Sequence, residues 1–210
     1  NALKLAKLLR AKNPGIKIII GGPHITAVPI ETAERLGIFF DIAVIGEGEV
    51  TILELINALN NNKPLSGVNG IAYPQKKEKS ALFFTKPREF IKELDSLPFP
   101  AWDLLPDLGK YYRPPAHTVK RFPAALLVTS RGCPGVCTFC DRKVFGRVLR
   151  GHSADYIIRM INHLKKRYGI NFLKTISGLL GAERGIYPVR RKSIYKLLAH
   201  PFLAKVLDKP

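Results

Sequence analysis

Three cysteines within eight positions are the residues of this sequence best suited to chemistry. Cys133, Cys137 and Cys140 have C-x₃-C-x₂-C spacing, and the sequence contains no other cysteine. Thiolates are soft ligands that favour zinc and iron–sulfur centres. A structural zinc site needs a fourth protein ligand, which here would have to be a side chain such as His152 or His24. An iron–sulfur cluster held by three cysteines keeps one iron open to a substrate or cofactor. A disulfide plus a free thiol is a third interpretation.

The segments around the cysteines predict where these residues lie. Residues 124–129 are apolar and rich in branched side chains, which indicates a buried strand. The cysteines therefore follow the end of a strand, where α/β folds place their functional loops. After the loop, Ser153 is a good N-cap for a helix that ends before Gly169, and residues 170–176 indicate another strand. The predicted order is strand, cysteine loop, helix, strand.

The cysteine spacing, with Phe139 directly before the last cysteine, resembles the signature of radical S-adenosylmethionine (radical SAM) enzymes. The resemblance implies that Cys133, Cys137 and Cys140 hold a 4Fe–4S cluster, that SAM binds its open iron, and that Phe139 lies by the adenine. It also implies reductive cleavage of SAM to a 5′-deoxyadenosyl radical, with electrons from a reductase or a flavodoxin- or ferredoxin-type donor. The predicted strand, loop, helix and strand are similar to the start of the family's partial TIM-like (β/α)₆ barrel.

The first 75 residues alternate helical and strand patterns. We expect helices at 2–12, 30–36 and 50–59, and strands at 16–20, 41–45 and 68–73, with 82–84 pairing back as a hairpin. Short turns between these elements are typical of a Rossmann-like, doubly wound parallel sheet. The predicted fold class is therefore α/β.

Glycine-rich turns follow two of the expected strands. They are Gly21-Gly22-Pro23-His24 and Gly46-Glu47-Gly48-Glu49, and glycine lets a ligand approach the backbone closely. Their order and spacing are similar to the second half of the cobalamin-binding domain of one radical SAM subfamily. That resemblance implies that cobalamin binds, with its nucleotide tail near Gly21, Gly22, Gly46, Glu47 and Gly48. The D-x-H-x-x-G motif is absent, so no histidine ligand to cobalt is assigned. The other interpretation is that the glycines only shape the turns.

The resemblances divide the chain into four expected regions. Residues 1–75 resemble the second half of a cobalamin-binding domain, and 76–120 form a hairpin and a proline-rich linker. Residues 121–178 begin the radical SAM barrel, and 179–210 are an unassigned basic tail. Because the chain starts at Asn1 within a helical pattern and carries only the first unit of a barrel, we expect a fragment of a longer enzyme with little turnover of its own.

Composition limits the classes of partner and location. The formal net charge is +18, and most of the excess lies in residues 101–210, which favours anionic partners. No apolar run reaches the roughly 18 residues that span a bilayer. Clustered cysteines in an odd number argue against a disulfide scaffold and favour the cytoplasm.

The predicted function is cobalamin-dependent methyl transfer or rearrangement on a small organic substrate by a radical SAM enzyme. No catalytic acid or base is assigned. Two alternatives are an RNA-modifying radical SAM enzyme and a non-enzymatic, zinc-containing nucleic-acid-binding module, although no nucleic-acid-binding motif is present.

Overall fold

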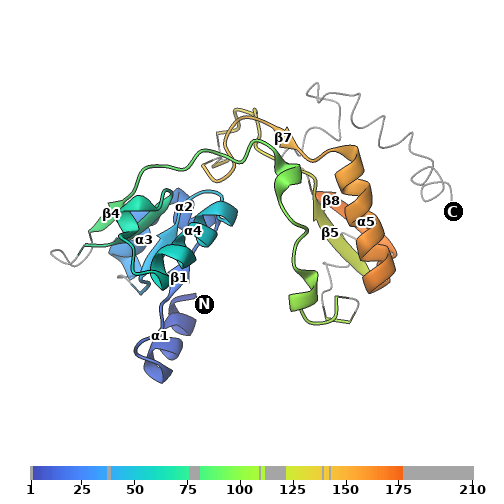
Figure 1. Cartoon of the computed structure of the whole chain (residues 1–210). Helices are drawn as coiled ribbons and strands as arrows, with labels where there is room; N and C mark the ends of the chain where they lie inside the picture. Colours follow the sequence, from blue (N-terminus) through green and yellow to red (C-terminus); the bar gives the residue numbers. More distant parts are fainter. Residues whose placement is uncertain are drawn as a thin grey trace. The chain divides into compact units, whose positions relative to one another are not determined.

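The structure, a computed structural model, describes residues 2–36, 39–75, 81–108, 110–111, 122–138, 140–141 and 143–176 (Figure 1). The chain forms two compact units. The first is Asn1–Ile91 with Val136–Gly146, and the second is Lys92–Gly135 with Arg147–Pro210. The predicted tail, residues 179–210, lies outside the described residues. No helix in the described part of the chain is long and apolar enough to cross a membrane.

The first unit is built on a four-stranded sheet. Its strands are β1 (Ile19–Ile20), β2 (Ile42–Val44), β3 (Ile71–Pro74) and β4 (Leu82–Phe84), paired in that order. Strands β1 and β2 are parallel, with Ile19 opposite Ile42. Strand β3 is antiparallel to both β2 and β4, so the predicted hairpin is confirmed. The predicted α/β class is also confirmed, with a parallel pair inside a mixed sheet.

Alternation of side chains along the strands gives this sheet two apolar faces. Ile42 and Val44 belong to one buried cluster with Leu55 of helix α4 (Glu49–Asn60). Ala43, between them, belongs to a second cluster with Ala6 and Ile25. Successive side chains of a strand point to opposite faces, so helices must cover both sides. Helices α1 (Ala2–Lys12) and α2 (Pro23–Ala27) cover the face that carries Ala43. Helix α3 (Pro29–Leu36) follows α2 in the chain.

The reversed direction of β3 follows from the path of the chain after α4. Helix α4 carries the chain away from the end of β2, and the segment after it runs back along the same helix through a short 3-10 turn, Leu65–Gly67. Lys63 N donates to Ala58 O near the end of α4, and Gly70 lies beside Thr51 at its start. The chain thus enters the sheet again at the end it left, which produces an antiparallel strand.

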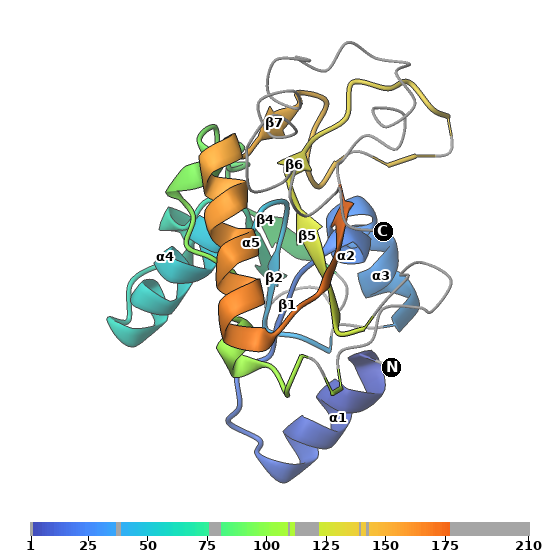
Figure 2. The ribbon, with the colours of Figure 1, turned by 90° about the vertical axis from the view of Figure 1, so that its right-hand side faces the viewer.

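The second unit pairs β5 (Ala124–Val128) in parallel with β8 (Phe172–Ile176), and helix α5 (Ala154–Tyr168) connects them. Figure 2 shows α5 lying beside both strands. Both ends of the helix are as predicted. At its start Ser153 Oγ accepts from Tyr156 N at 3.1 Å, and at its end Gly169 adopts a left-handed conformation. Leu164 and Ile161 of its apolar face pack with Leu127 of β5.

From Lys92 onward the proline-rich linker belongs to the second unit. It contains two 3-10 turns, Leu94–Ser96 and Trp102–Leu104. Trp102 and Leu108 belong to the same buried cluster as α5, and the Phe99 ring lies 5.1 Å from that of Tyr156 in an edge-to-face arrangement. The linker is therefore part of this unit's core.

Two leucines of α4 provide a test of the first unit's packing. Leu55 is fully buried, whereas Leu53 on the same helix is 70% exposed. We expect Leu55→Ala to lower the free energy of unfolding by about 2–5 kcal/mol, because it leaves a cavity in the core. Leu53→Ala should change it by less than about 0.5 kcal/mol. Urea unfolding followed by circular dichroism measures both, and equal effects would contradict this packing.

Candidate cofactor sites

A short antiparallel ladder closes the base of the cysteine loop. Strand β6 (Ser130–Arg131) pairs with β7 (Arg150–Gly151), and His152 N extends the ladder by donating to Thr129 O at 3.0 Å. Figure 2 shows β6 and β7 beyond one end of β5. The three cysteines therefore lie on a loop whose two ends are joined by backbone hydrogen bonds. We call the segments at these two ends, β6 and β7 with their neighbours, the arms of the loop. The sequence patterns did not indicate this ladder, because each strand has only two residues.

The cysteines themselves are free thiols. Cys133 is half-buried, whereas Cys137 and Cys140 are exposed. Cys140 N donates to Cys137 O at 3.3 Å, so the last two form one turn. They belong to the first unit, and Cys133 belongs to the second. Phe139 lies outside the described residues. Within the described positions, no three His, Cys, Asp or Glu side chains converge as a metal site.

Asp95 of the linker fixes the second arm of the loop. Its carboxylate accepts hydrogen bonds from Ser153 N at 3.1 Å and from His152 Nδ1 at 2.9 Å. The His152 side chain is only 9% exposed, and its ring stacks on that of Tyr156 with centroids 4.3 Å apart. The Tyr156 hydroxyl donates to Leu97 O. Linker, loop arm and helix start are thus joined at one point.

These contacts shift two pKa values. Desolvation alone would raise the pKa of Asp95, but the hydrogen bonds from Ser153 and His152 outweigh it and hold the pKa below its ordinary value. Burial raises the pKa of Tyr156, and the negative charge of Asp95 raises it further. Asp95 is therefore ionised at neutral pH and Tyr156 is not. Asp95 was absent from the predicted site residues, because no local pattern marks a contact 58 positions away in the chain.

The two glycine turns lie side by side at the ends of β1 and β2. A hydrogen bond joins the second turn to the helix that begins in the first turn, since Gly46 N donates to Thr26 Oγ1 of α2 at 3.0 Å. The Thr26 side chain is buried. Parallel neighbouring strands bring their carboxyl ends to one edge, which is where open α/β sheets bind ligands. Thr26 was not predicted, because its partner is 20 positions away.

The glycines of these turns serve two different purposes. Gly22 has φ +98° and Gly46 has φ +82°, and no atom lies within 4 Å of where a Cβ would stand on either. Both turns require glycine for their backbone conformation and leave open space in front of it. At Gly21 and Gly48, in contrast, a Cβ would lie 3.6 Å from the Val44 side chain. Gly22 and Gly46 are therefore the positions that a large ligand could approach.

The polar side chains of the turns are engaged with the protein. Glu47 is buried, and its Oε2 accepts a hydrogen bond from Ile91 N at 2.8 Å. Thr32 Oγ1 donates to Val28 O at 2.6 Å and contacts His24 Nε2 at 3.2 Å. A hydroxyl has one proton, so Thr32 must accept from His24, which places the ring proton on Nε2.

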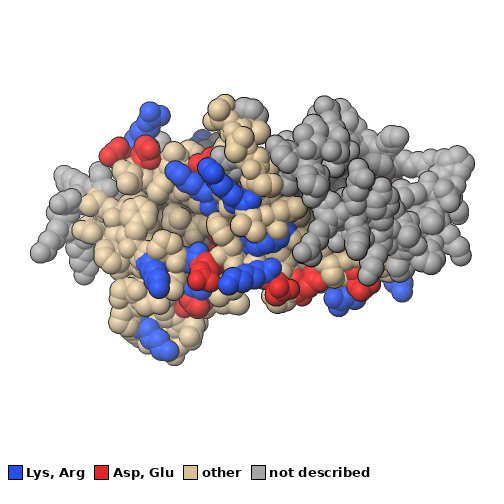
Figure 3. Space-filling model, turned by 90° about the horizontal axis from the view of Figure 1, so that it is seen from above, with Lys and Arg blue, Asp and Glu red and all other residues tan. Residues whose placement is uncertain are grey.

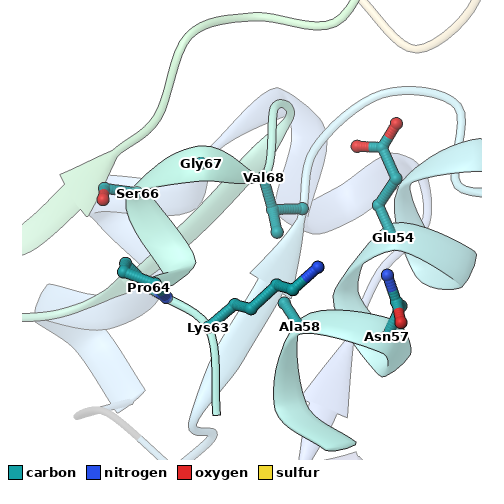
Figure 4. A pocket seen from close by; sticks show the side chains of 8 residues that line it. All are labelled: Glu54, Asn57, Ala58, Lys63, Pro64, Ser66, Gly67 and Val68. Atoms are coloured by element: carbon teal, nitrogen blue, oxygen red, sulfur yellow. The ribbon is translucent and has the colours of Figure 1, made fainter. Parts of the chain in front are cut away.

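Mixed charge and a hollow mark other parts of the surface that the structure describes. On the face drawn in Figure 3, the described Lys and Arg side chains alternate with Asp and Glu. Figure 4 shows a hollow of about 470 Å³ between α4 and the segment that returns along it, with Glu54 and Lys63 at its sides. None of the predicted site residues lines this hollow. The candidate sites therefore remain the cysteine loop and the glycine turns.

The Asp95 contacts predict a pH-dependent contribution to stability. We expect Asp95→Ala to lower the free energy of unfolding by about 1–2 kcal/mol at pH 7, because Ser153 N and His152 lose their acceptor. Asp95→Asn keeps an acceptor oxygen and should cost less. A lowered folded-state pKa stabilises the fold at neutral pH, and this contribution is lost as the pH falls from about 4 through the folded-state value.

Thermal unfolding of both variants between pH 7 and pH 2.5 measures this dependence. Asp103→Asn, at an exposed carboxylate of the same linker, is the control and should match the unsubstituted protein. A loss in Asp95→Asn that persists unchanged at the lowest pH would contradict the assigned role of the charge.

Comparison with known proteins identifies the family of the chain. A B12 binding domain model matches residues 1–56. An uncharacterized methyltransferase of Pyrococcus horikoshii is 36% identical over 171 residues, covering 81% of this chain and 35% of the relative. The cobalamin-dependent radical SAM methyltransferase TokK of Streptomyces tokunonensis is 30% identical over 140 residues, covering 66% of this chain and 20% of TokK.

Solved structures agree in fold. The cobalamin-dependent S-adenosylmethionine radical enzyme OxsB, with aqua-cobalamin bound, superposes with a TM-score of 0.65 and 24% identity. The likeness covers 84% of this chain and 23% of OxsB. The chain thus spans about a third or less of the length of the curated relatives described above. It belongs to the radical SAM superfamily, in the subfamily whose members carry a cobalamin-binding domain.

Proposed function

We propose that this chain is the cobalamin-binding and cluster-binding part of a radical SAM enzyme that acts on a small organic substrate. One observation carries the proposal: three free cysteines with C-x₃-C-x₂-C spacing lie on a loop closed by β6 and β7, in a chain that also matches a B12 binding domain. The donor set fits a soft iron–sulfur centre, since no disulfide consumes a thiol among the described residues.

Each part of the loop has a proposed role. Cys133, Cys137 and Cys140 would supply thiolates to a 4Fe–4S cluster, and Phe139 would lie against the adenine of SAM. The cluster, when bound, supplies the electron that cleaves SAM. The β6–β7 ladder and the Asp95 contacts hold the arms of the loop, so that the ligands start from a restricted set of positions.

The glycine turns would receive the nucleotide tail of cobalamin. Open space in front of Gly22 and Gly46 fits close approach of a large ligand to the backbone. Gly21 and Gly48 would support these turns by packing on Val44. The Glu47 carboxylate would support the second turn, because it accepts the hydrogen bond that holds Ile91 against this turn.

The proposed cofactors suggest a reaction for the whole enzyme. We propose methyl transfer to, or rearrangement of, a small organic substrate, with a reductase or a flavodoxin- or ferredoxin-type protein as electron donor. We propose the reducing cytoplasm as the location of the protein, which clustered free thiols favour. We also propose the domain division drawn from the sequence, with 1–75 as the cobalamin half, 76–120 as the linker and 121–178 as the start of the barrel.

Reconstitution tests the cluster directly. Incubating the 210-residue chain with iron and sulfide under anaerobic conditions should give about four iron and four sulfide per chain and a broad absorption at about 400 nm. Replacing any one of the three cysteines by alanine should abolish most of this absorption, because three ligands are the minimum set. Val136→Ala, at an exposed residue of the same loop, should retain it. Zinc without inorganic sulfide would refute the cluster and favour the zinc alternative.

Cobalamin binding is tested at the second glycine turn. Gly46→Val should weaken the binding of aquacobalamin by at least about tenfold, because it strains a left-handed backbone and fills the space in front of the turn. Gly67→Ala, whose Cβ would also meet nothing within 4 Å but outside both turns, should bind normally. Titration followed by the absorption change of the corrin measures both. Equal affinities would show that the glycines only shape the turns.

A further inference from the structure

The second half of the cysteine loop is packed on the first unit. The segment Val136–Gly146 belongs to that unit, although the residues before and after it in the chain belong to the second. This segment carries Cys137 and Cys140. Contacts of Gly146 and Lys143 hold this segment on the first unit.

Gly146 makes the closer contact. Its φ is +72°, and a Cβ built on it would lie 2.6 Å from Cε2 and 2.9 Å from Cζ of Phe90. Real Cβ atoms do not approach a ring carbon so closely, so the Phe90 ring lies against the bare backbone of Gly146. Any other residue at position 146 would strain the backbone and displace the ring. Glycine here allows a loop and an aromatic side chain 56 positions apart in sequence to touch.

Lys143 makes the second contact. Its Nζ donates to the carbonyl of Ala27, the last residue of α2, at 2.8 Å. Lys143 N donates to Asp141 Oδ1 at 2.7 Å, which forms a tight turn directly after Cys140. Helix α2 also provides Thr26, which binds Gly46 N of the second glycine turn. One short helix therefore contacts both the cysteine segment and the glycine turns.

We propose that Gly146, Phe90 and Lys143 are positioning residues that hold the Cys137–Cys140 segment on the cobalamin-binding unit, so that cluster retention depends on this docking. A cluster requires its thiolates to converge, and a segment already held in place loses less conformational entropy when it binds. The docking itself needs no cofactor, whereas its effect on the cluster rests on the proposed function.

Hydrogen exchange of the full chain without cluster tests the docking. Gly146→Ala and Phe90→Ala should each accelerate amide exchange in the peptide covering 136–146 by at least about fivefold, because local opening becomes easier. Gly169→Ala is the matched control, since Gly169 also has a positive φ but nothing within 4 Å of its Cβ position. It should change exchange only at the end of α5. The double variant Phe90→Ala/Gly146→Ala should accelerate exchange by less than the two single effects combined, because both substitutions break one contact and only the backbone strain at position 146 adds to it.

Cluster retention tests the positioning role. After reconstitution and addition of a chelator, Gly146→Ala and Lys143→Met should lose the absorption at about 400 nm several-fold faster than the unsubstituted chain, with the melting temperature of the apo protein as the control for folding. Unchanged exchange at 136–146 in both single variants would overturn the docking. Faster exchange with unchanged cluster loss would overturn the positioning role. If the unsubstituted chain binds no cluster, the proposed function fails, and the exchange data still decide the docking.

Discussion

Backbone pairing between β6 and β7 is the constraint on which the candidate cluster site depends. These two strands have only two residues each, and a ladder this short is not stable alone. It persists because β5 leads directly into β6 and because Asp95 anchors the residues that follow β7. The base of the loop is therefore held by the parallel β5–β8 pair and by the linker together, and Cys137 and Cys140 on the loop are exposed.

The glycine turns of the first unit are likewise positioned by contacts outside the turns themselves. The parallel pair β1–β2 is short, and its position is fixed by burial on both faces, with Ile42 and Ala43 in opposite clusters. A shift of one residue in the pairing would exchange these two faces, so the register is strongly determined. Both turns consequently emerge at one edge, where the Gly46–Thr26 hydrogen bond holds the second turn to helix α2.

Elements with strong periodicity were predictable from the sequence, and contacts distant in the chain were not. Helix α5 has an N-cap, an apolar face and a terminal glycine within 17 residues, and its ends match the structure. The direction of β3 depends on how the chain returns along α4, which no local pattern encodes. Asp95, Thr26 and Phe90 act through partners far away in sequence. The cysteines could be selected as candidate ligands because their spacing is itself the signal, whereas the contacts that support their loop are tertiary.

The hydrogen-bond partners of the polar side chains at the glycine turns limit the kind of ligand that these turns could bind. Glu47 and Thr26 direct their oxygens to backbone N–H groups of the protein, so neither contributes a charge or hydroxyl to a ligand. What remains in front of Gly22 and Gly46 is open backbone. Such a surface offers shape more than charge. The proposed ligand, cobalamin, is large and would suit it better than a small anion, which would need cationic side chains for comparable affinity.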